Sequence, residues 1–144
     1  VFRLRPGVLD DLGLVDALDW FTTDFERRTE ITCVFEYDNV PSLHEALATA
    51  AYRITQEALT NIARHAHASR VDVALRAQNG TLTLAVVDNG KGFRVFELNE
   101  SEGLGVAGMR ERAGLVGGVL EVFSEPEKGT QVYFKVPIDG GPGV

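Results

Sequence analysis

Residues 71–75 and 82–87 are mostly apolar, and a short polar stretch containing Asn79-Gly80 separates them. Both of these turn residues tolerate the positive φ angles that a tight hairpin requires. We therefore predict an antiparallel pair of strands here. Residues 119–123 and 131–136 repeat the pattern and predict a second hairpin. Residues 31–37 are β-branched and aromatic, which predicts one further strand.

Helical periodicity lies between these strands. Residues 12–28 follow Asp10-Asp11 and end at two arginines, as a helix dipole favours, and we expect Trp20, Phe21 and Phe25 to lie in the core. The clearest helix is predicted for residues 42–66, where Ser42 and Glu45 match a capping box. Its apolar stripe consists of Leu43, Leu47, Ala50, Ile54, Ala58 and Ile62. A shorter helix is predicted for residues 106–116.

Hairpins with inserted helices predict the fold class α/β. The arrangement is a two-layer sandwich, with a mixed, mostly antiparallel sheet that carries its helices on one face.

Length, charge and composition restrict the classes of function that the chain can have. The 144 residues suit one domain, and the formal charge of −7 argues against a broad nucleic-acid surface. A single cysteine, Cys33, excludes an internal disulfide and fits a reducing compartment. No apolar run is long enough to span a bilayer. The only methionine is Met109, so we interpret the chain as a fragment of a longer protein.

Glu57, Asn61 and His65 are spaced by four and predict one polar helix edge beside the apolar stripe. A carboxylate and an amide there could face a cleft, and an Asn carbonyl suits a hard cation such as Mg²⁺. A solvated helix edge explains the same residues equally well.

Glycine-rich segments follow two of the predicted elements. Asp88-Asn89-Gly90-Lys91-Gly92-Phe93 follows a strand, and Gly103 to Met109 precede a helix with the spacing G-x-G-x-x-G. Such a helix start offers free N–H groups to phosphate. A dinucleotide-binding βαβ unit does not fit, because a hairpin follows the glycines. Each segment alone, like Gly129-Thr130 at the start of the last strand, also suits an ordinary turn.

Taken together in this order, the segments resemble the ATP-binding domain of sensor histidine kinases, in the superfamily that also includes DNA gyrase and the mismatch-repair ATPases (GHKL, Bergerat fold). Gln56 to Ala66 is similar to the N box, Asp88 to Phe93 to the G1 box, and Gly103 to Met109 to the G2 box. Leu4-Arg5-Pro6 with residues 9–14, and Gly108-Met109-Arg110-Glu111-Arg112, resemble the nitrate-sensor and lipid-fluidity-sensor branch.

The resemblance implies a role for each matching residue. Asp88 would bind the adenine amino group, helped by Thr130, and Asn61 would hold Mg²⁺. Glu57 would orient or deprotonate the attacking histidine. Arg64 and His65 would lie near the nucleotide, and Gly90 and Gly92 would let the backbone pass it. The phosphate lid, about residues 94–105, would be shaped by Gly103, Gly105 and Gly108, with Leu104 and Val106 also binding nucleotide.

The same resemblance implies that residues 1–11 are a junction from dimerisation helices, residues 12–138 the catalytic domain, and residues 139–144 a flexible tail. The phosphoacceptor histidine would lie on those absent helices rather than at His44, His65 or His67. A homodimeric parent would pass the phosphoryl group to a response regulator. This domain would be cytoplasmic, in a parent that is soluble or membrane-anchored.

Two other functions compete with this one. The first is a serine kinase of the anti-sigma-factor type, against which the junction-like N-terminus and residues 108–112 argue. The second is a non-catalytic module that binds ATP to regulate a partner, against which Glu57 and Asn61 argue.

Overall fold

Alternating apolar residues form the strands of this protein, and longer apolar stripes form its helices. The computed structural model describes residues 13–92 and 105–138. The elements in chain order are α2 (Leu14–Thr29), β1 (Thr32–Asp38), α3 (Glu45–Asn61), a π-helical turn η1 (Ile62–Ala66), β2 (Arg70–Gln78), β3 (Thr81–Asp88), α4 (Val106–Leu115), β4 (Val119–Ser124) and β5 (Thr130–Pro137). The expected junction 1–11 and tail 139–144 lie outside the described residues.

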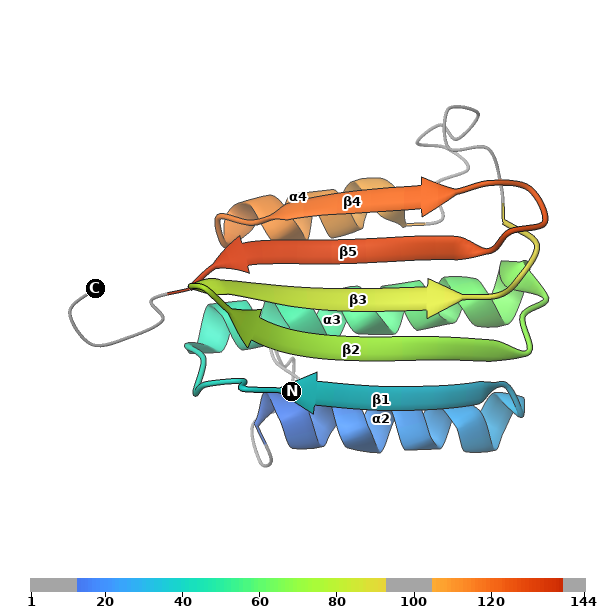
Figure 1. The fold of residues 1–144 in the computed structure, drawn as a ribbon, viewed down its shortest axis with the longest axis horizontal. Coiled ribbons are helices and arrows are strands. Elements are labelled where there is room, and N and C mark those ends of the chain that lie inside the picture. The colour runs from blue at the N-terminus through green and yellow to red at the C-terminus, as the bar shows by residue number, and fades with distance from the viewer. Residues whose placement is uncertain (1–12, 93–104, 139–144) are drawn as a thin grey trace, which may run out of the picture.

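One sheet holds all five of these strands, in the order β1-β2-β3-β5-β4. β1 pairs with β2 in parallel, whereas the β2–β3, β3–β5 and β4–β5 pairs are antiparallel. Figure 1 shows the three helices on one face of the sheet, with α2 along β1, α3 behind β2 and β3, and α4 behind β4. The predicted two-layer α/β sandwich with a mixed sheet is therefore confirmed.

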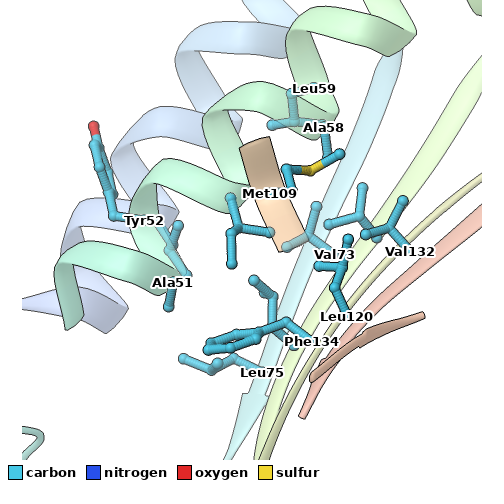
Figure 2. Close-up of a cluster of buried hydrophobic side chains, with 14 of the residues drawn as sticks. Ala51, Tyr52, Ala58, Leu59, Val73, Leu75, Met109, Leu120, Val132 and Phe134 are labelled. Atoms are coloured by element: carbon cyan, nitrogen blue, oxygen red, sulfur yellow. The ribbon is translucent and has the colours of Figure 1, made fainter. Parts of the chain in front are cut away.

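The core lies between the sheet and the helices. In β2, β3 and β5 every second residue is buried, as expected for strands with one covered face. Figure 2 shows part of this cluster, in which Leu75 and Phe134 from the sheet face Ala51 of α3, and Met109 of α4 lies beside Ala58. The core therefore joins both long helices and α4 to one sheet face.

The Asn79-Gly80 turn is formed as predicted. Both residues have positive φ, 54° and 75°, and Gln78 pairs with Thr81 across the turn. These angles match the tight turns that follow the twist of a strand pair. The turn fixes the register of β2 against β3 over their whole length.

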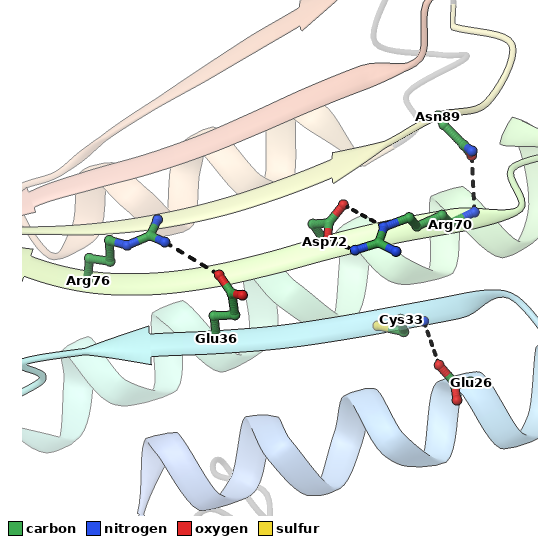
Figure 3. A network of polar contacts seen from close by, with 7 residues as sticks. All are labelled: Glu26, Cys33, Glu36, Arg70, Asp72, Arg76 and Asn89. Carbon is green, nitrogen blue, oxygen red and sulfur yellow. Dashed lines mark hydrogen bonds and ion pairs between the residues drawn. The ribbon is translucent and has the colours of Figure 1, made fainter.

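Polar contacts protect the edge and the open face of the sheet (Figure 3). Glu26 of α2 accepts a hydrogen bond of 2.7 Å from the backbone N–H of Cys33, on the edge strand β1. This contact occupies a donor that an unprotected edge would offer to another strand.

Burial, with help from the nearby Glu26 and Asp72 carboxylates, raises the pKa of the Cys33 thiol to about 12. The thiol is therefore uncharged and unreactive at neutral pH.

The start of α3 differs from the prediction. The helix begins at Glu45, with His44 as its N-cap, and Nδ1 of His44 accepts a hydrogen bond of 3.3 Å from the N–H of Leu47. The expected Ser42–Glu45 capping box is therefore wrong, because Glu45 is the first helical residue rather than the third. Leu43 packs against the core from the segment before the helix. That packing moves the helix start beyond Ser42.

The assignment of Trp20 to the core is also wrong. Its side chain is 51% exposed, whereas Phe25 is buried and Phe21 packs against the core edge-to-face with Tyr52. Trp20 lies two residues from the buried Leu18, which turns it about 200° around the helix, away from the core. No helix within the described residues is long and apolar enough to cross a membrane.

Replacing His44 tests the observed cap. We expect His44→Ala to lower the free energy of unfolding by about 0.5–1 kcal/mol, because an N-terminal N–H of α3 loses its acceptor. The matched control Ser42→Ala should change it by less than about 0.5 kcal/mol, since Ser42 is exposed and precedes the cap. Urea denaturation of both variants measures the difference, and a larger loss in Ser42→Ala would restore the capping box.

Candidate functional site

An apolar cavity of about 150 Å³ lies between the helical layer and the ends of three strands. An apolar cavity of this size can accept a single aromatic ring. Its walls come from α3 and η1, from the first turns of α4, and from the inward faces of β3, β4 and β5. The apolar lining residues are Ala58, Ile62, Ala66, Val86, Val106, Met109, Val122 and Val132.

Polar side chains from separate parts of the chain enter the same cavity. Asn61 ends α3, His65 lies in η1, Asp88 ends β3, Lys91 follows it in the loop, and Thr130 begins β5. Four of these five were predicted as site residues from sequence, and the structure brings them together. The combination of apolar walls and a few convergent polar groups is typical of a small-molecule site.

Asp88 is the buried carboxylate of this site, with 6% of its surface exposed. It stands opposite Val71 of β2 and Thr130 of β5 in the sheet register. Burial raises the pKa of the Asp88 carboxyl, and hydrogen bonds from the backbone N–H groups of Gly90 and Thr130 oppose that rise. The bond from Gly90 to Oδ1 measures 2.7 Å. The structure thus presents a polar acceptor in the lining of an apolar cavity.

The loop that follows Asp88 forms hydrogen bonds with backbone groups of the two segments on either side of it. Oδ1 of Asn89 accepts hydrogen bonds of 3.0 Å from the N–H groups of Ser69 and Arg70, the second of which is drawn in Figure 3. The N–H of Lys91 donates to the carbonyl of Ala66 at 2.7 Å. These bonds fix the G1-like loop between the start of β2 and the end of η1.

Gly90 makes this close approach possible. A Cβ atom at Gly90 would lie 2.3 Å from the carbonyl oxygen of Ala66 and 2.8 Å from its Cβ. Gly92 is equally close to another turn, since a Cβ there would lie 2.0 Å from the carbonyl oxygen of Glu125. Both glycines therefore allow close packing of the loop, and Gly92 also lines the cavity.

Only part of the predicted helix edge reaches the cavity. The wider π-helical turn follows Asn61 directly, so the four-residue spacing does not continue as a regular α-helix. Asn61 and His65 line the cavity, whereas Glu57 and Arg64 do not. Glu57 is half-buried beside Gly105, and Arg64 is exposed. The structure thus places the predicted carboxylate beside the cavity instead of inside it.

The second glycine segment is described only from Gly105 onward, and Gly103 and Leu104 lie outside the described residues. Gly105 is the N-cap of α4, with φ of 71°, and Val106 lines the cavity. Gly108 lies in the first turns of α4, where a Cβ atom would meet nothing within 4 Å. Among the described members of this segment, only Val106 and Met109 reach the cavity wall.

Sequence reasoning missed Lys91 and most of the apolar wall. Lys91 lies between Gly90 and Gly92, and nothing in the sequence marked it as part of the cavity. Val86, Val122 and Val132 were visible only as inward positions of alternating strands. That alternation identified them as buried but could not show that their strand ends surround a cavity.

Comparison of the chain with known proteins identifies its family. The sequence profile of the "Histidine kinase-, DNA gyrase B-, and HSP90-like ATPase" family matches residues 46–140, more than half of the chain. The sensor histidine kinase LiaS of Bacillus subtilis is 38% identical over 138 residues, which cover 96% of this chain and 38% of that protein. The oxygen sensor histidine kinase NreB of Staphylococcus carnosus is 35% identical, over 94% of this chain and 40% of that protein.

Solved structures agree with the sequence matches. The blue-light activated histidine kinase of Erythrobacter litoralis EL346 superimposes with a TM-score of 0.71 at 25% identity, over 87% of this chain and 42% of that one. The catalytic domain of histidine kinase ThkA has the same fold, with a TM-score of 0.68 at 18% identity, over 86% of this chain and 91% of that one.

The chain belongs to the histidine kinase-, DNA gyrase B- and HSP90-like ATPase family, and over most of its length it is similar to sensor histidine kinases. It spans about 40% of the length of the curated relatives LiaS and NreB.

Replacing Gly90 tests the close approach at Ala66. We expect Gly90→Ala to lower the free energy of unfolding by about 1–3 kcal/mol, because the added methyl group overlaps backbone that cannot retreat without breaking the Lys91–Ala66 hydrogen bond. Gly114→Ala in α4 is the control: its Cβ meets nothing within 4 Å, and alanine should stabilise that helix by about 0.5–1 kcal/mol. Thermal denaturation distinguishes the two, and equal midpoints would contradict the close packing.

Proposed function

We propose that the cavity binds ATP and that the domain transfers the γ-phosphoryl group to a histidine on a separate dimerisation domain. One observation carries this proposal: Asp88 places a buried carboxylate in the lining of an apolar cavity that can hold a single ring. An adenine ring would bury its faces against Ile62, Val86 and Met109, and its exocyclic amine would donate to Asp88. A guanine ring would instead place a carbonyl oxygen against that carboxylate.

The phosphate groups would extend toward Asn61 and His65, which line the same cavity. Within residues 13–92 and 105–138, no group of three or more His, Cys, Asp or Glu side chains could hold a metal ion. A bound Mg²⁺ would therefore have few protein ligands, which fits an ion held by the Asn61 side-chain oxygen and by phosphate oxygens. Such an ion neutralises phosphate charge. Arg64 and Lys91 would add local positive charge on an otherwise acidic chain.

The transfer step requires a nucleophile from outside the cavity. An imidazole nitrogen of the acceptor histidine would form the bond to the γ-phosphorus while the bond to the β–γ bridging oxygen breaks, which leaves ADP. Glu57 would accept the hydrogen bond or the proton from the other ring nitrogen. Phosphoryl transfer depends mainly on positioning and charge neutralisation, so few protein groups are needed.

The parent protein would supply the rest of the signalling cycle. We propose a homodimeric parent whose dimerisation helices precede this domain and carry the acceptor histidine. The phosphoryl group would then pass to an aspartate of a response regulator. The three histidines of the described residues are not assigned as the acceptor. His44 caps α3, His65 lines the cavity and His67 ends η1. The domain would act in the cytoplasm.

Replacing Asp88 by asparagine separates binding from folding. We expect Asp88→Asn to weaken ATP binding by about tenfold to hundredfold, because a charge-assisted hydrogen bond to the base is lost. Isothermal titration calorimetry with ATP and Mg²⁺ measures the affinity. Asp72→Asn on the open sheet face serves as the control and should bind normally. Unchanged affinity in Asp88→Asn would contradict the assigned orientation of the base.

The same variant should remain folded, and the sign of its stability change follows from the pKa of Asp88. Burial raises that pKa, so the folded protein favours the protonated carboxyl, and stability is lost as pH rises through the folded pKa. At pH 7 without nucleotide, Asp88→Asn should therefore unfold at the same temperature as the wild type or higher. Any gain should vanish on acidification toward the ordinary value near 3.8, where the wild-type carboxyl is protonated too.

Phosphoryl transfer is tested with labelled ATP and a separate dimerisation-helix fragment. We expect label on the fragment and none on this chain, whereas Glu57→Gln should bind ATP normally but transfer little label. Stable label on the isolated chain would contradict the acceptor assignment. Tight ATP binding without transfer by the wild type would favour a regulatory ATP-binding module.

A further inference from the structure

Gly105 and Glu57 contact each other across the gap between α4 and α3. A Cβ atom placed on Gly105 would lie 2.2 Å from Oε2 of Glu57, 2.6 Å from its Cδ and 2.7 Å from its Cγ. These are the three nearest heavy atoms to that position, and all belong to this one side chain. The place that a side chain at residue 105 would occupy is therefore filled by the Glu57 carboxyl group.

The surroundings explain why a carboxylate lies there. Gly105 is the N-cap of α4, and the helix has no side-chain hydrogen bond at this cap and no acidic residue in its first turn. The N-terminal end of a helix carries partial positive charge, which favours a nearby carboxylate. The next residue, Val106, lines the cavity, as does Asn61, which lies one helical turn after Glu57. The contact thus holds the carboxylate beside the cavity.

We propose that Gly105 is a positioning residue for the Glu57 carboxylate. The transfer step requires the absence of a side chain at residue 105 more than it requires the backbone flexibility of a glycine. This inference rests on the proposed role of Glu57 in phosphoryl transfer. The contacting atoms are the far end of a flexible side chain, so a methyl group at residue 105 would displace the carboxylate instead of unfolding the domain. A misplacement of about 1 Å can slow a reaction on the order of 100-fold.

The test compares two alanine substitutions with the same backbone cost. Gly105 and Gly117 both have positive φ, 71° and 80°, and they flank the same helix. A Cβ atom on Gly117 would meet nothing within 4 Å. Gly105→Ala and Gly117→Ala therefore share the backbone strain, and only the first displaces Glu57. Transfer to the dimerisation-helix fragment and ATP affinity are measured for both.

We expect Gly105→Ala to reduce the transfer rate constant at saturating ATP on the order of 100-fold relative to Gly117→Ala. In a Glu57→Ala background the two substitutions should give equal residual transfer, because the displaced group is gone. Equal transfer rate constants of the two single variants at saturating ATP would overturn the proposal, because any effect of Gly105 would then come only from nucleotide binding.

A second measurement needs neither nucleotide nor acceptor. The carbon NMR signal of the Glu57 carboxyl group should shift in Gly105→Ala and remain in place in Gly117→Ala. An unchanged signal in both would overturn the positioning role. If instead the wild type fails to transfer while the signal shifts as expected, the proposed function is wrong and the contact stands.

Discussion

The hydrogen bond from the N–H of Lys91 to the carbonyl of Ala66, 2.7 Å long, joins the end of the helical layer to the end of the sheet. The cavity lies between these two ends, and Ala66 itself is one of its lining residues. Gly90 allows the approach, because any side chain there would meet the same carbonyl. Ala66 is the last residue of the π-helical turn η1.

The burial of the Asp88 carboxylate is an energetic cost of this arrangement. Asp88 is almost fully buried, and its raised pKa shows that burial outweighs the two backbone hydrogen bonds it accepts. The strand register fixes its position, since Val71 and Thr130 flank it in the sheet. The fold tolerates this cost at one position, where a ligand donor would offset it. Sites of binding often retain such locally unfavourable groups.

The sequence was sufficient for both hairpins and for part of the site, but not for the order of the strands in the sheet. Alternation and the Asn79-Gly80 turn predicted both hairpins, since these signals are local. The start of α3 was misplaced because packing of Leu43 outweighed a local capping signal, and Trp20 was assigned to the core although its helix turns it outward. Asp88, Thr130, Asn61 and His65 converge as expected from their motifs. The contact of Gly105 with Glu57 depends on how two helices approach each other, which no local pattern records.

Glu57 lies apart from the cavity wall, which bears on whether it acts on the bound nucleotide or on the incoming nucleophile. Asn61 faces the cavity, whereas Glu57, one turn earlier on the same helix, lies against the start of α4. A group that acts on the bound base or phosphates would be expected within the wall. A group that acts on a nucleophile arriving from another domain belongs at the margin, where that nucleophile can reach it. The position of Glu57 therefore favours an acceptor supplied from outside this domain.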